Sequence, residues 1–369
     1  MRDGLVPVLL PLAVDQTYDY LVPKGTDVEP GSFVLVPFGR QTRIGIVWDT
    51  AFGGPSEPVD PKKLKGLLEI LDIPVLPPVS LRFVEWVARY TLSLHGMVLR
   101  LMMSPPSALE SPKAQRGVSL AHASSSSLRL TPARARAIEV SQDGVIRTKS
   151  DVAKRAQCSL GVIDGLVSAG IFVEVSFPPK TFPVPNAHHQ PTTFTESQAK
   201  AVAVIASAFE AQNFSVTLLD GVTGSGKTEV YFEAVARCLE RGDQVLIMLP
   251  EIALTSQFTE RFRKRFGVVP VEWHSALSDS ERGKIWTATL KGDVRVVVGA
   301  RSALFLPFRS LGLIIVDEEH DAGYKQDDRV HYHARDMSVV RARLGNFPAL
   351  LASATPSLES HVNARSGRY

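Results

Sequence analysis

Hydrophobic residues in the first hundred positions occur in short runs with the spacing of β-strands. Up to about residue 103, the runs VPVLLPL, TYDYLVP, SFVLVPFG and RIGIVWD are separated by Pro, Gly and Asp, which is typical of a small all-β unit. Apolar residues at helical spacing follow, at Phe83, Val84, Val87 and Tyr90, and they predict one or two closing helices. Residues 1–103 are therefore expected to form a β-rich domain closed by helices.

The hydrophobic pattern is lost between residues 104 and 127, where Ser, Ala and Pro are frequent. This composition predicts a flexible linker over 104–127. Three helical stretches follow, TPARARAIEVSQ, TKSDVAKRAQ and SLGVIDGLVSAG, and the last leads into the strand IFVEVSF. Helices followed by a short strand suggest a winged-helix-like module over 128–180. Such modules serve protein contacts as often as DNA contacts.

A different pattern begins after the Pro-rich run PPKTFPVPNAHHQP. The segments SVTLLD, QVLIMLP, VRVVVGA, LGLIIVD and FPALLASA are apolar almost throughout, and amphipathic helical stretches separate them. Continuous apolar strands that alternate with helices predict a parallel sheet covered on both faces. The expected fold class is therefore multidomain α/β, with residues 190–369 forming a lobe around a parallel sheet.

Composition and charge restrict the possible classes of protein. A chain of 369 residues with 44% hydrophobic and 21% charged residues is expected to form two or three globular domains. No run approaches the roughly 20 apolar residues of a membrane span. The two cysteines, Cys158 and Cys238, exclude a disulfide framework and a Cys-rich zinc site, and they fit the reducing cytoplasm. The net charge of +3 permits nucleic-acid binding without requiring it.

The segment LDGVTGSGKTEVYFEA matches the phosphate-binding loop pattern G-x-x-x-x-G-K-[ST] between a strand and a helix. The predicted ATP-binding residues are Gly221, Val222, Thr223, Gly224, Ser225, Gly226, Lys227 and Thr228. The glycines let the backbone direct N–H groups at phosphate oxygens. Lys227 would hold the β and γ phosphates, and the Thr228 hydroxyl would bind Mg²⁺. The alternative is a glycine-rich turn without a ligand.

Two acidic residues follow the apolar run LGLIIV. Asp317 stands at the carboxyl end of this predicted strand, where α/β sheets place their ligand sites. We expect Asp317 to hold Mg²⁺ and Glu318 to orient and deprotonate the attacking water. The alternative is that DEEH forms a solvated acidic loop. The predicted catalytic residues are therefore Lys227, Asp317 and Glu318.

DEEH together with the later segment SATPS (residues 353–357) resembles superfamily 2 helicases. FTESQAKAV resembles the segment in which a glutamine, here Gln198, contacts the adenine edge. LPEIALTSQ, WHSALSDSER and VVVGARSALFLPF resemble motifs of the bacterial replication-restart helicase family, PriA or primosomal protein N′. The resemblance implies that residues 190–369 are the first RecA-like P-loop NTPase lobe of such a helicase.

The segment DEEHDAGYKQDDRVHYHARDMSVVRA resembles the aromatic-rich loop of that family, which senses bound DNA. Val330 and His331 stand where the family pattern has an aromatic residue. Aromatic and basic side chains together also suit a platform for single-stranded DNA. The residues expected to contact DNA here are Tyr324, Lys325, Tyr332 and Arg335. The alternative is a buried aromatic cluster.

The N-terminal region is similar to the 3′-DNA-binding domain of the same family, which captures the 3′ end of a nascent leading strand. By this resemblance, Tyr18 and Asp19 would line the end-binding pocket and Lys65 would contact the terminal nucleotide. An aromatic face, an acceptor for the 3′-hydroxyl and a cation for phosphate form a chemically sensible set. The resemblance also implies that residues 128–180 are the winged-helix domain of the family.

The resemblance implies an ATP- and Mg²⁺-dependent 3′–5′ DNA helicase that takes part in replication restart and primosome assembly in the cytoplasm, in association with the nucleoid. Its implied partners are forked and single-stranded DNA, primosome proteins, single-stranded DNA-binding protein and the replicative helicase. The protein is expected to be monomeric and not bound to membranes.

Full-length members of the family continue into a second RecA-like lobe that carries the arginine finger and zinc-binding cysteines. The sequence ends at Tyr369 without these features, so no zinc ligands are expected here. We therefore expect a fork-binding protein with an ATP-binding lobe that is impaired in unwinding. The alternative is a non-enzymatic DNA-binding scaffold in which the nucleotide site is idle.

Overall fold

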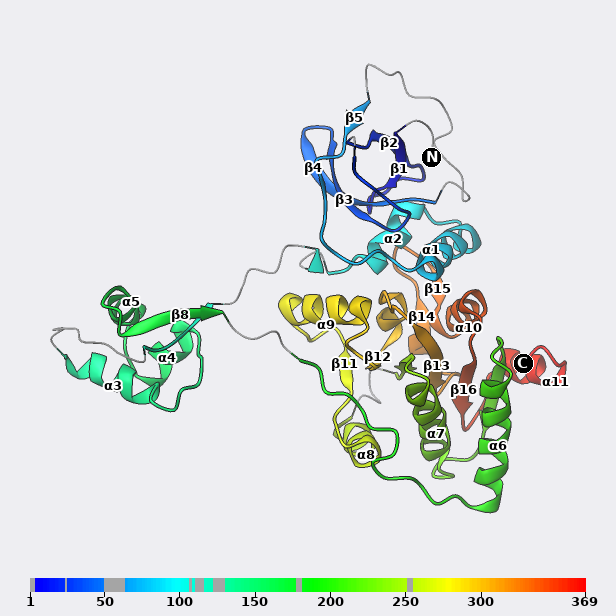
Figure 1. Ribbon diagram of the computed structural model, residues 1–369. Coiled ribbons are helices and arrows are strands. Elements are labelled where there is room, and N and C mark those ends of the chain that lie inside the picture. The colour runs from blue at the N-terminus through cyan, green and yellow to red at the C-terminus, as the bar shows by residue number, and fades with distance from the viewer. Residues whose placement is uncertain are drawn as a thin grey trace. The chain divides into compact units, whose positions relative to one another are not determined.

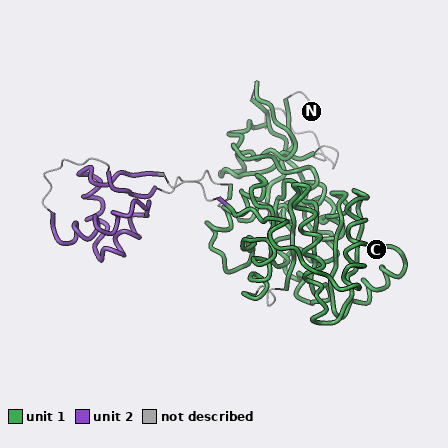
Figure 2. The backbone as a smooth tube through the Cα atoms, turned by 60° about the horizontal axis from the view of Figure 1, so that its bottom comes forward, with its two compact units in different colours: residues 1–109, 182–369 green, residues 110–181 purple. Residues whose placement is uncertain are grey.

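The computed structural model describes residues 4–23, 25–49, 64–105, 108–109, 116–121, 130–176, 181–250 and 255–369. The chain divides into two compact units (Figure 2). The first unit joins residues 1–109 to residues 182–369, and the second comprises residues 110–181. Among the described residues, no helix has the length and apolar character that crossing a membrane requires.

The N-terminal region is built on a six-stranded sheet in the order β5-β2-β1-β4-β3-β6. Its strands are β1 (Leu5–Leu9), β2 (Tyr18–Leu21), β3 (Phe33–Phe38), β4 (Gln41–Val47), β5 (Lys65–Gly66) and β6 (Glu69–Ile70). All neighbours are antiparallel except β2 and β5. Helices α1 (Pro78–Thr91) and α2 (His95–Met102) follow. The prediction of a β-rich region closed by helices is confirmed.

Successive side chains of these strands point to opposite faces of the sheet, and both faces are buried. Val6, Val8 and Val34 belong to a cluster on one face, whereas Leu9 and Phe33 belong to the cluster that includes the helices. This arrangement follows from the period of two in a strand, which sends successive side chains to opposite faces.

Residues 182–369 form a lobe around a six-stranded parallel sheet in the order β11-β12-β10-β13-β16-β9. Its strands are β9 (Val216–Asp220), β10 (Gln244–Met248), β11 (Val271–Trp273), β12 (Val296–Gly299), β13 (Leu311–Asp317) and β16 (Ala349–Ser353). The predicted parallel sheet is confirmed. Because all six strands point the same way, their carboxyl ends lie at one edge.

Helices cover both faces of this sheet (Figure 1). The helices are α6 (Glu196–Glu210), α7 (Lys227–Glu240), α8 (Ser256–Phe266), α9 (Asp279–Lys291), α10 (Ala334–Gly345) and α11 (Leu358–Arg365). Side chains of α6, α7 and α8 share one cluster with one face of the sheet, and side chains of α9 and α10 share a second cluster with the other face. Short elements connect these layers: η5 (Arg301–Phe305), η6 (Ala322–Tyr324), β14 (Lys325–Gln326) and β15 (Tyr332–His333).

The N-terminal region packs directly on the α9 and α10 layer of the lobe. The indole N–H of Trp286 on α9 donates to the carbonyl oxygen of Met102 at 2.8 Å, and its ring lies 5.7 Å from that of Phe33. The guanidinium of Arg341 on α10 is buried and lies 5.4 Å from the ring centroid of Phe83. Burial lowers the pKa of Arg341 to about 9. These contacts make the two regions one compact unit.

Within its described residues, the second unit contains three short helices and a two-stranded sheet. The helices are α3 (Pro132–Val140), α4 (Lys149–Arg155) and α5 (Leu160–Ser168), and the antiparallel strands are β7 (Arg116–Leu120) and β8 (Phe172–Ser176). Val118, Val152 and Phe172 contribute to its core. Strand β7 was not expected, since it lies within residues 104–127, for which a linker is predicted. Residues 106–107, 110–115 and 122–127 of that segment lie outside the described residues.

Candidate nucleotide and DNA-binding site

A glycine-rich loop (residues 221–228) leaves β9 and runs into the first turn of α7 at Lys227. Gly226 caps this helix with φ +83°, and a Cβ atom at this position would lie 2.4 Å from the amide nitrogen of Gln198. Gly224 also has a positive φ, of +80°. L-residues rarely adopt this conformation, so the loop requires glycine at these positions. The backbone N–H groups of the helix N-terminus are a ready site for an anion.

The Lys227 side chain lies back on the glycine-rich loop. Its ammonium donates to the carbonyl oxygen of Gly221 at 2.6 Å and lies 3.4 Å from that of Val222. Val222 itself is 74% exposed. The Lys227 ammonium is thus bonded to neutral carbonyl groups of an exposed loop. An anionic ligand could replace these carbonyl groups as its hydrogen-bond acceptor, because hydrogen bonds between charged groups are stronger.

Asp317 at the end of β13 faces the same helix. The Tyr231 hydroxyl on α7 donates to one carboxylate oxygen at 2.9 Å, and the Glu318 backbone N–H donates to the other at 3.0 Å. Burial raises the pKa of Asp317, although the Tyr231 hydrogen bond and the nearby Lys227 charge act in the opposite direction. Burial, and then the Asp317 charge, raises the pKa of Tyr231 well above its usual value. The structure therefore brings Asp317, Lys227 and the start of α7 together.

Glu318 occupies an unusual backbone conformation. Its φ is +47°, which is rare for a residue other than glycine, and its side chain is 40% exposed. The Glu318 carboxylate lies 3.7 Å from Nδ1 of His320. Strained residues that are held by the surrounding structure gather at functional sites. Glu318 thus projects its carboxylate beside Asp317 toward solvent.

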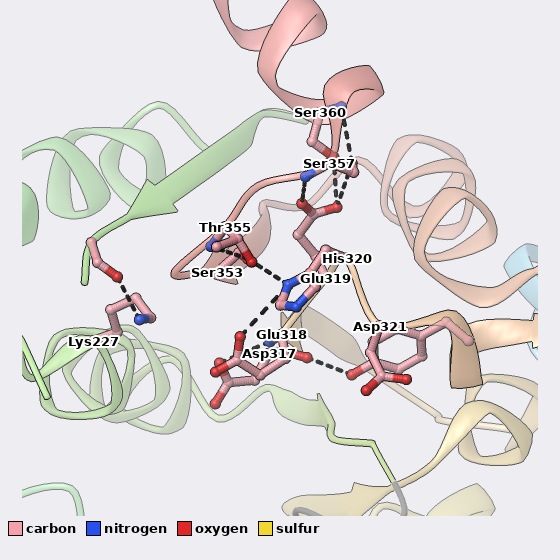
Figure 3. Close-up of polar contacts among 12 residues, drawn as sticks. Lys227, Asp317, Glu318, Glu319, His320, Asp321, Ser353, Thr355, Ser357 and Ser360 are labelled. Atoms are coloured by element: carbon pink, nitrogen blue, oxygen red, sulfur yellow. Dashed lines mark hydrogen bonds and ion pairs between the residues drawn. The ribbon is translucent and has the colours of Figure 1, made fainter. Parts of the chain in front are cut away.

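The segment 353–357 links the two halves of this site. The Ser353 carbonyl accepts from the Gly221 N–H at 3.2 Å, and the Ser353 hydroxyl lies 2.7 Å from Nδ1 of His320. The Thr355 N–H donates to the same hydroxyl at 3.1 Å. The end of β16 therefore contacts both the glycine-rich loop and the DEEH segment (Figure 3).

Glu319, the third residue of DEEH, was not predicted to matter. It is fully buried, and its carboxylate accepts from the Ser357 N–H at 2.6 Å and from the hydroxyls of Ser357 and Ser360 at 3.0 and 2.8 Å. Arg335 donates to it at 3.1 Å. Burial by itself would raise the pKa of Glu319, but these donors outweigh it and hold the pKa below the usual value. We call Glu319, Arg335, Ser357 and Ser360 the buried acid–arginine network.

Three of the four residues predicted to form a stacking platform are buried in the structure. Tyr324 is 1% exposed, and its hydroxyl lies 2.6 Å from the Asp317 carbonyl oxygen and 3.0 Å from that of Met248. Tyr332 is 7% exposed and packs edge-on against Phe305, and Arg335 is buried in the network. Buried rings and a paired guanidinium cannot receive bases without moving. The alternative of a buried cluster describes these three residues.

Lys325 is the member of that predicted set which lies at the surface. It is exposed, and its ammonium pairs with Asp327 at 3.2 Å. An exposed ion pair of this kind is weak and is easily exchanged for a phosphate.

Gln198 lies against the glycine-rich loop. It is the third residue of α6, where its side-chain oxygen accepts from the Thr195 N–H at 2.9 Å. Its amide nitrogen donates to the Ser225 carbonyl oxygen at 2.8 Å. The same contact explains why residue 226 has no room for a side chain.

The three residues predicted to bind a DNA end lie on neighbouring strands. Tyr18 and Asp19 are on β2, and Lys65 on the adjacent β5 pairs in register with Tyr20. The Tyr18 ring packs edge-on against Phe38 with 5.2 Å between centroids. Tyr18 and Asp19 are half-buried, whereas Lys65 is exposed.

The donor set at the glycine-rich loop fits magnesium better than a transition metal. In the part of the chain that the structure describes, no three His, Cys, Asp or Glu residues group as a metal site. Mg²⁺ does not require such a group, since it is bound through one or two carboxylates, waters and substrate phosphates. A hydroxyl at Thr228 and a carboxylate at Asp317 beside the glycine-rich loop match that preference.

Comparison with known proteins matches two separate parts of the chain. Residues 7–104 match the 3′ DNA-binding domain (3′BD) of PriA, and residues 195–363 match the DEAD/DEAH box helicase family. Replication restart protein PriA of Haemophilus influenzae is 35% identical over 99% of this chain and 51% of that protein. PriA of Rickettsia felis is 34% identical over 99% of this chain and 45% of that protein.

The chain thus spans about half the length of these relatives. Among solved structures, the helicase domain of Pyrococcus furiosus Hef is similar, with 22% identity and a TM-score of 0.34 over 46% of this chain and 36% of that one. At this TM-score the similarity supports no conclusion about function.

Proposed function

Because the chain belongs to the PriA family of replication restart proteins across 99% of its length, we propose that it binds DNA at stalled or branched replication forks. There it would help to reload the replicative helicase. The observation that carries this proposal is that the region matching the 3′ DNA-binding domain and the helicase lobe pack around one hydrophobic cluster. The proposed site for a DNA end and the proposed nucleotide-binding lobe would then belong to the same compact unit.

The lobe is proposed to bind ATP and Mg²⁺ at the glycine-rich loop. The loop N–H groups and Lys227 would hold the phosphates, because the hydrogen bonds of the Lys227 ammonium within the described residues are to backbone carbonyl groups. Thr228 and Asp317 would hold Mg²⁺, which supplies charge neutralisation for phosphoryl transfer when it is bound. Gln198 would contact the adenine edge, since its side chain already lies on the loop.

Glu318 is the proposed general base. Its exposed carboxylate stands beside Asp317, where it can orient a water molecule and accept its proton. Hydrolysis is proposed to be fast only when a cation from another surface reaches the glycine-rich loop, which is exposed at Val222; such a cation contributes roughly 10³–10⁵ in rate.

DNA contacts are proposed at three places. Tyr18, Asp19 and Lys65 would hold a 3′ end through an aromatic face, a hydroxyl acceptor and a phosphate cation. Lys325 would contact the backbone of a strand at the lobe. Residues 128–180 would act as a winged-helix module, which is supported by three short helices and a paired strand.

The proposed setting is the nucleoid in the cytoplasm. By family membership, the proposed partners are primosome proteins, single-stranded DNA-binding protein and the replicative helicase. A second function class is a scaffold that binds forks and assembles partners with an idle nucleotide site.

Fork binding is tested with two synthetic forks that differ only in the leading-strand end, a 3′-hydroxyl or a 3′-phosphate. Wild type is expected to prefer the 3′-hydroxyl fork. Lys65→Glu is expected to lose about tenfold in affinity for that fork, the cost of one charge-assisted contact. Arg40→Glu, which reverses an exposed cation in the β3–β4 turn, is the control. Equal binding of both forks by wild type would remove the end-binding role.

Phosphate release separates the enzyme from the scaffold. Wild type and Lys227→Ala are compared with saturating ATP, with and without fork DNA. A rate that rises with DNA in wild type only supports the enzyme. Identical rates in both proteins support the scaffold.

A further inference from the structure

The side chain of Tyr231 lies between the two residues proposed to hold Mg²⁺. Tyr231 stands one helical turn after Lys227 on α7, and it is fully buried. Its hydroxyl donates to a carboxylate oxygen of Asp317 at 2.9 Å, and the Thr228 side chain makes a hydrogen bond with the same hydroxyl. One phenol therefore connects the start of α7 to the end of β13.

The Asp317 carboxylate accepts hydrogen bonds from two neutral donors. The Glu318 backbone N–H donates to one oxygen at 3.0 Å, and the Tyr231 hydroxyl donates to the other. A hydrogen bond on each oxygen fixes the orientation of the carboxylate. Because a neutral donor does not cancel the negative charge, that charge remains available to a cation bound beside the glycine-rich loop.

Two other buried tyrosines use their hydroxyls differently. Tyr20 in the N-terminal sheet donates to the Pro37 carbonyl oxygen at 3.1 Å, and the Tyr324 hydroxyl contacts two backbone carbonyl oxygens. These hydroxyls satisfy backbone groups of the core. The Tyr231 hydroxyl instead donates to the side chain of a proposed metal ligand. A phenylalanine at this position would fill the same space in the core without supplying that donor.

We propose that Tyr231 is a positioning residue for the Mg²⁺ of a bound nucleotide. It would hold the Asp317 carboxylate in one orientation and keep the Thr228 hydroxyl beside it, so that both groups are in place before the metal arrives. Removal of a hydrogen-bond partner that orients a metal ligand typically lowers metal affinity by about 10–100-fold. The inference rests on the proposed nucleotide site and adds to it a residue that acts through Asp317.

The test measures how much Mg²⁺ strengthens the binding of a fluorescent ATP analogue. Each protein is titrated with the analogue in excess Mg²⁺ and again in EDTA, and the ratio of the two affinities is what we call the metal gain. Tyr231→Phe, which removes only the hydroxyl, is expected to lower the metal gain about tenfold and to leave the affinity in EDTA within about twofold of wild type. The control Tyr20→Phe removes a buried hydroxyl from the N-terminal sheet and should leave both quantities unchanged.

A second comparison shows whether the hydroxyl acts through Asp317. In the Asp317→Asn background, Tyr231→Phe should cause no further loss of metal gain, because the charge that it positions is already gone. The inference is overturned if Tyr231→Phe keeps the wild-type metal gain, if it weakens binding equally in Mg²⁺ and in EDTA, or if it causes the same loss in both backgrounds. A wild type that does not bind the analogue, or that shows no metal gain, would overturn the proposed nucleotide site and this inference with it.

Discussion

The glycine-rich loop and the buried acid–arginine network meet at DEEH, yet their polar groups are satisfied to different extents. In the loop, Lys227 contacts backbone carbonyls at an exposed surface. In the network, Glu319 accepts from four donors and is fully buried. The adjacent side chains of Glu318 and Glu319 point in different directions (Figure 3).

This difference separates groups that are available to a ligand from groups that hold the site in place. A buried charge whose hydrogen bonds are all made within the chain has little left to offer a substrate. A half-buried lysine that rests on neutral acceptors of an exposed loop exchanges them for phosphate at small cost. We infer that Glu319 is a positioning residue that ties the DEEH segment to the start of α11, whereas Lys227, Asp317 and Glu318 are the groups that meet a nucleotide.

The largest expected effect comes from truncation of the network. Glu319→Ala should lower the free energy of unfolding by about 2–4 kcal/mol, because it leaves the Ser357 N–H and the Ser360 hydroxyl without their acceptor and removes one of the acidic partners of buried Arg335, which keeps Asp336 at 2.8 Å. The matched truncation Glu318→Ala should change it by less than about 0.5 kcal/mol, since the side chain is 40% exposed. Urea denaturation of both variants measures the difference. An equal loss of unfolding free energy in the two variants would contradict the proposal that Glu319 holds the structure together and Glu318 does not.

A smaller effect is expected from methyl groups added to the glycine-rich loop. Gly226→Ala should destabilise the chain by about 1–3 kcal/mol, because its Cβ would meet Gln198 at 2.4 Å and its φ is positive. Gly224→Ala has the same backbone strain but no atom within 4 Å of its Cβ, so its cost should be about 1–2 kcal/mol. Thermal unfolding compares the two. If Gly224→Ala were less stable than Gly226→Ala, the close contact between residue 226 and the Gln198 side chain would be contradicted.

The smallest expected effect is a pH dependence at Asp317. Burial raises the folded-state pKa of Asp317, so its ionisation costs the folded state stability as pH rises from the unfolded pKa through the folded pKa. Asp317→Asn removes that cost. Wild type should therefore lose stability relative to the variant as pH rises above about 4, the usual pKa of an aspartate. Asp220→Asn removes an exposed carboxylate from the same edge of the sheet and controls for net charge. If the difference in stability between wild type and Asp317→Asn did not change with pH, the burial of the Asp317 carboxylate would be contradicted.

The sequence predicted those parts of the fold and site that depend on local pattern. The strand before Gly221, the helix after Lys227 and the position of Asp317 at the end of β13 all follow from periodicity and glycine placement. A parallel sheet then brings strand ends to one edge, which is why two distant motifs meet.

Residue chemistry alone did not predict which polar and aromatic side chains are buried. The sequence around Tyr324 and Tyr332 does not distinguish an exposed tyrosine from a buried one. Their burial is set by how η6 and β15 pack in the folded chain. The role of Glu319 depends on donors from residues 357 and 360, which no local pattern connects to it. The packing of the N-terminal region on α9 and α10 is likewise a long-range property.

The most direct test of the central claim is a titration of the 369-residue chain with a fluorescent ATP analogue and Mg²⁺. Wild type should bind, and Lys227→Ala should bind about 10–100-fold more weakly, the cost of one to two charge-assisted hydrogen bonds. Lys200→Ala, which removes an exposed lysine from α6, should bind like wild type. Equal affinity of wild type and Lys227→Ala would contradict a nucleotide site at the glycine-rich loop.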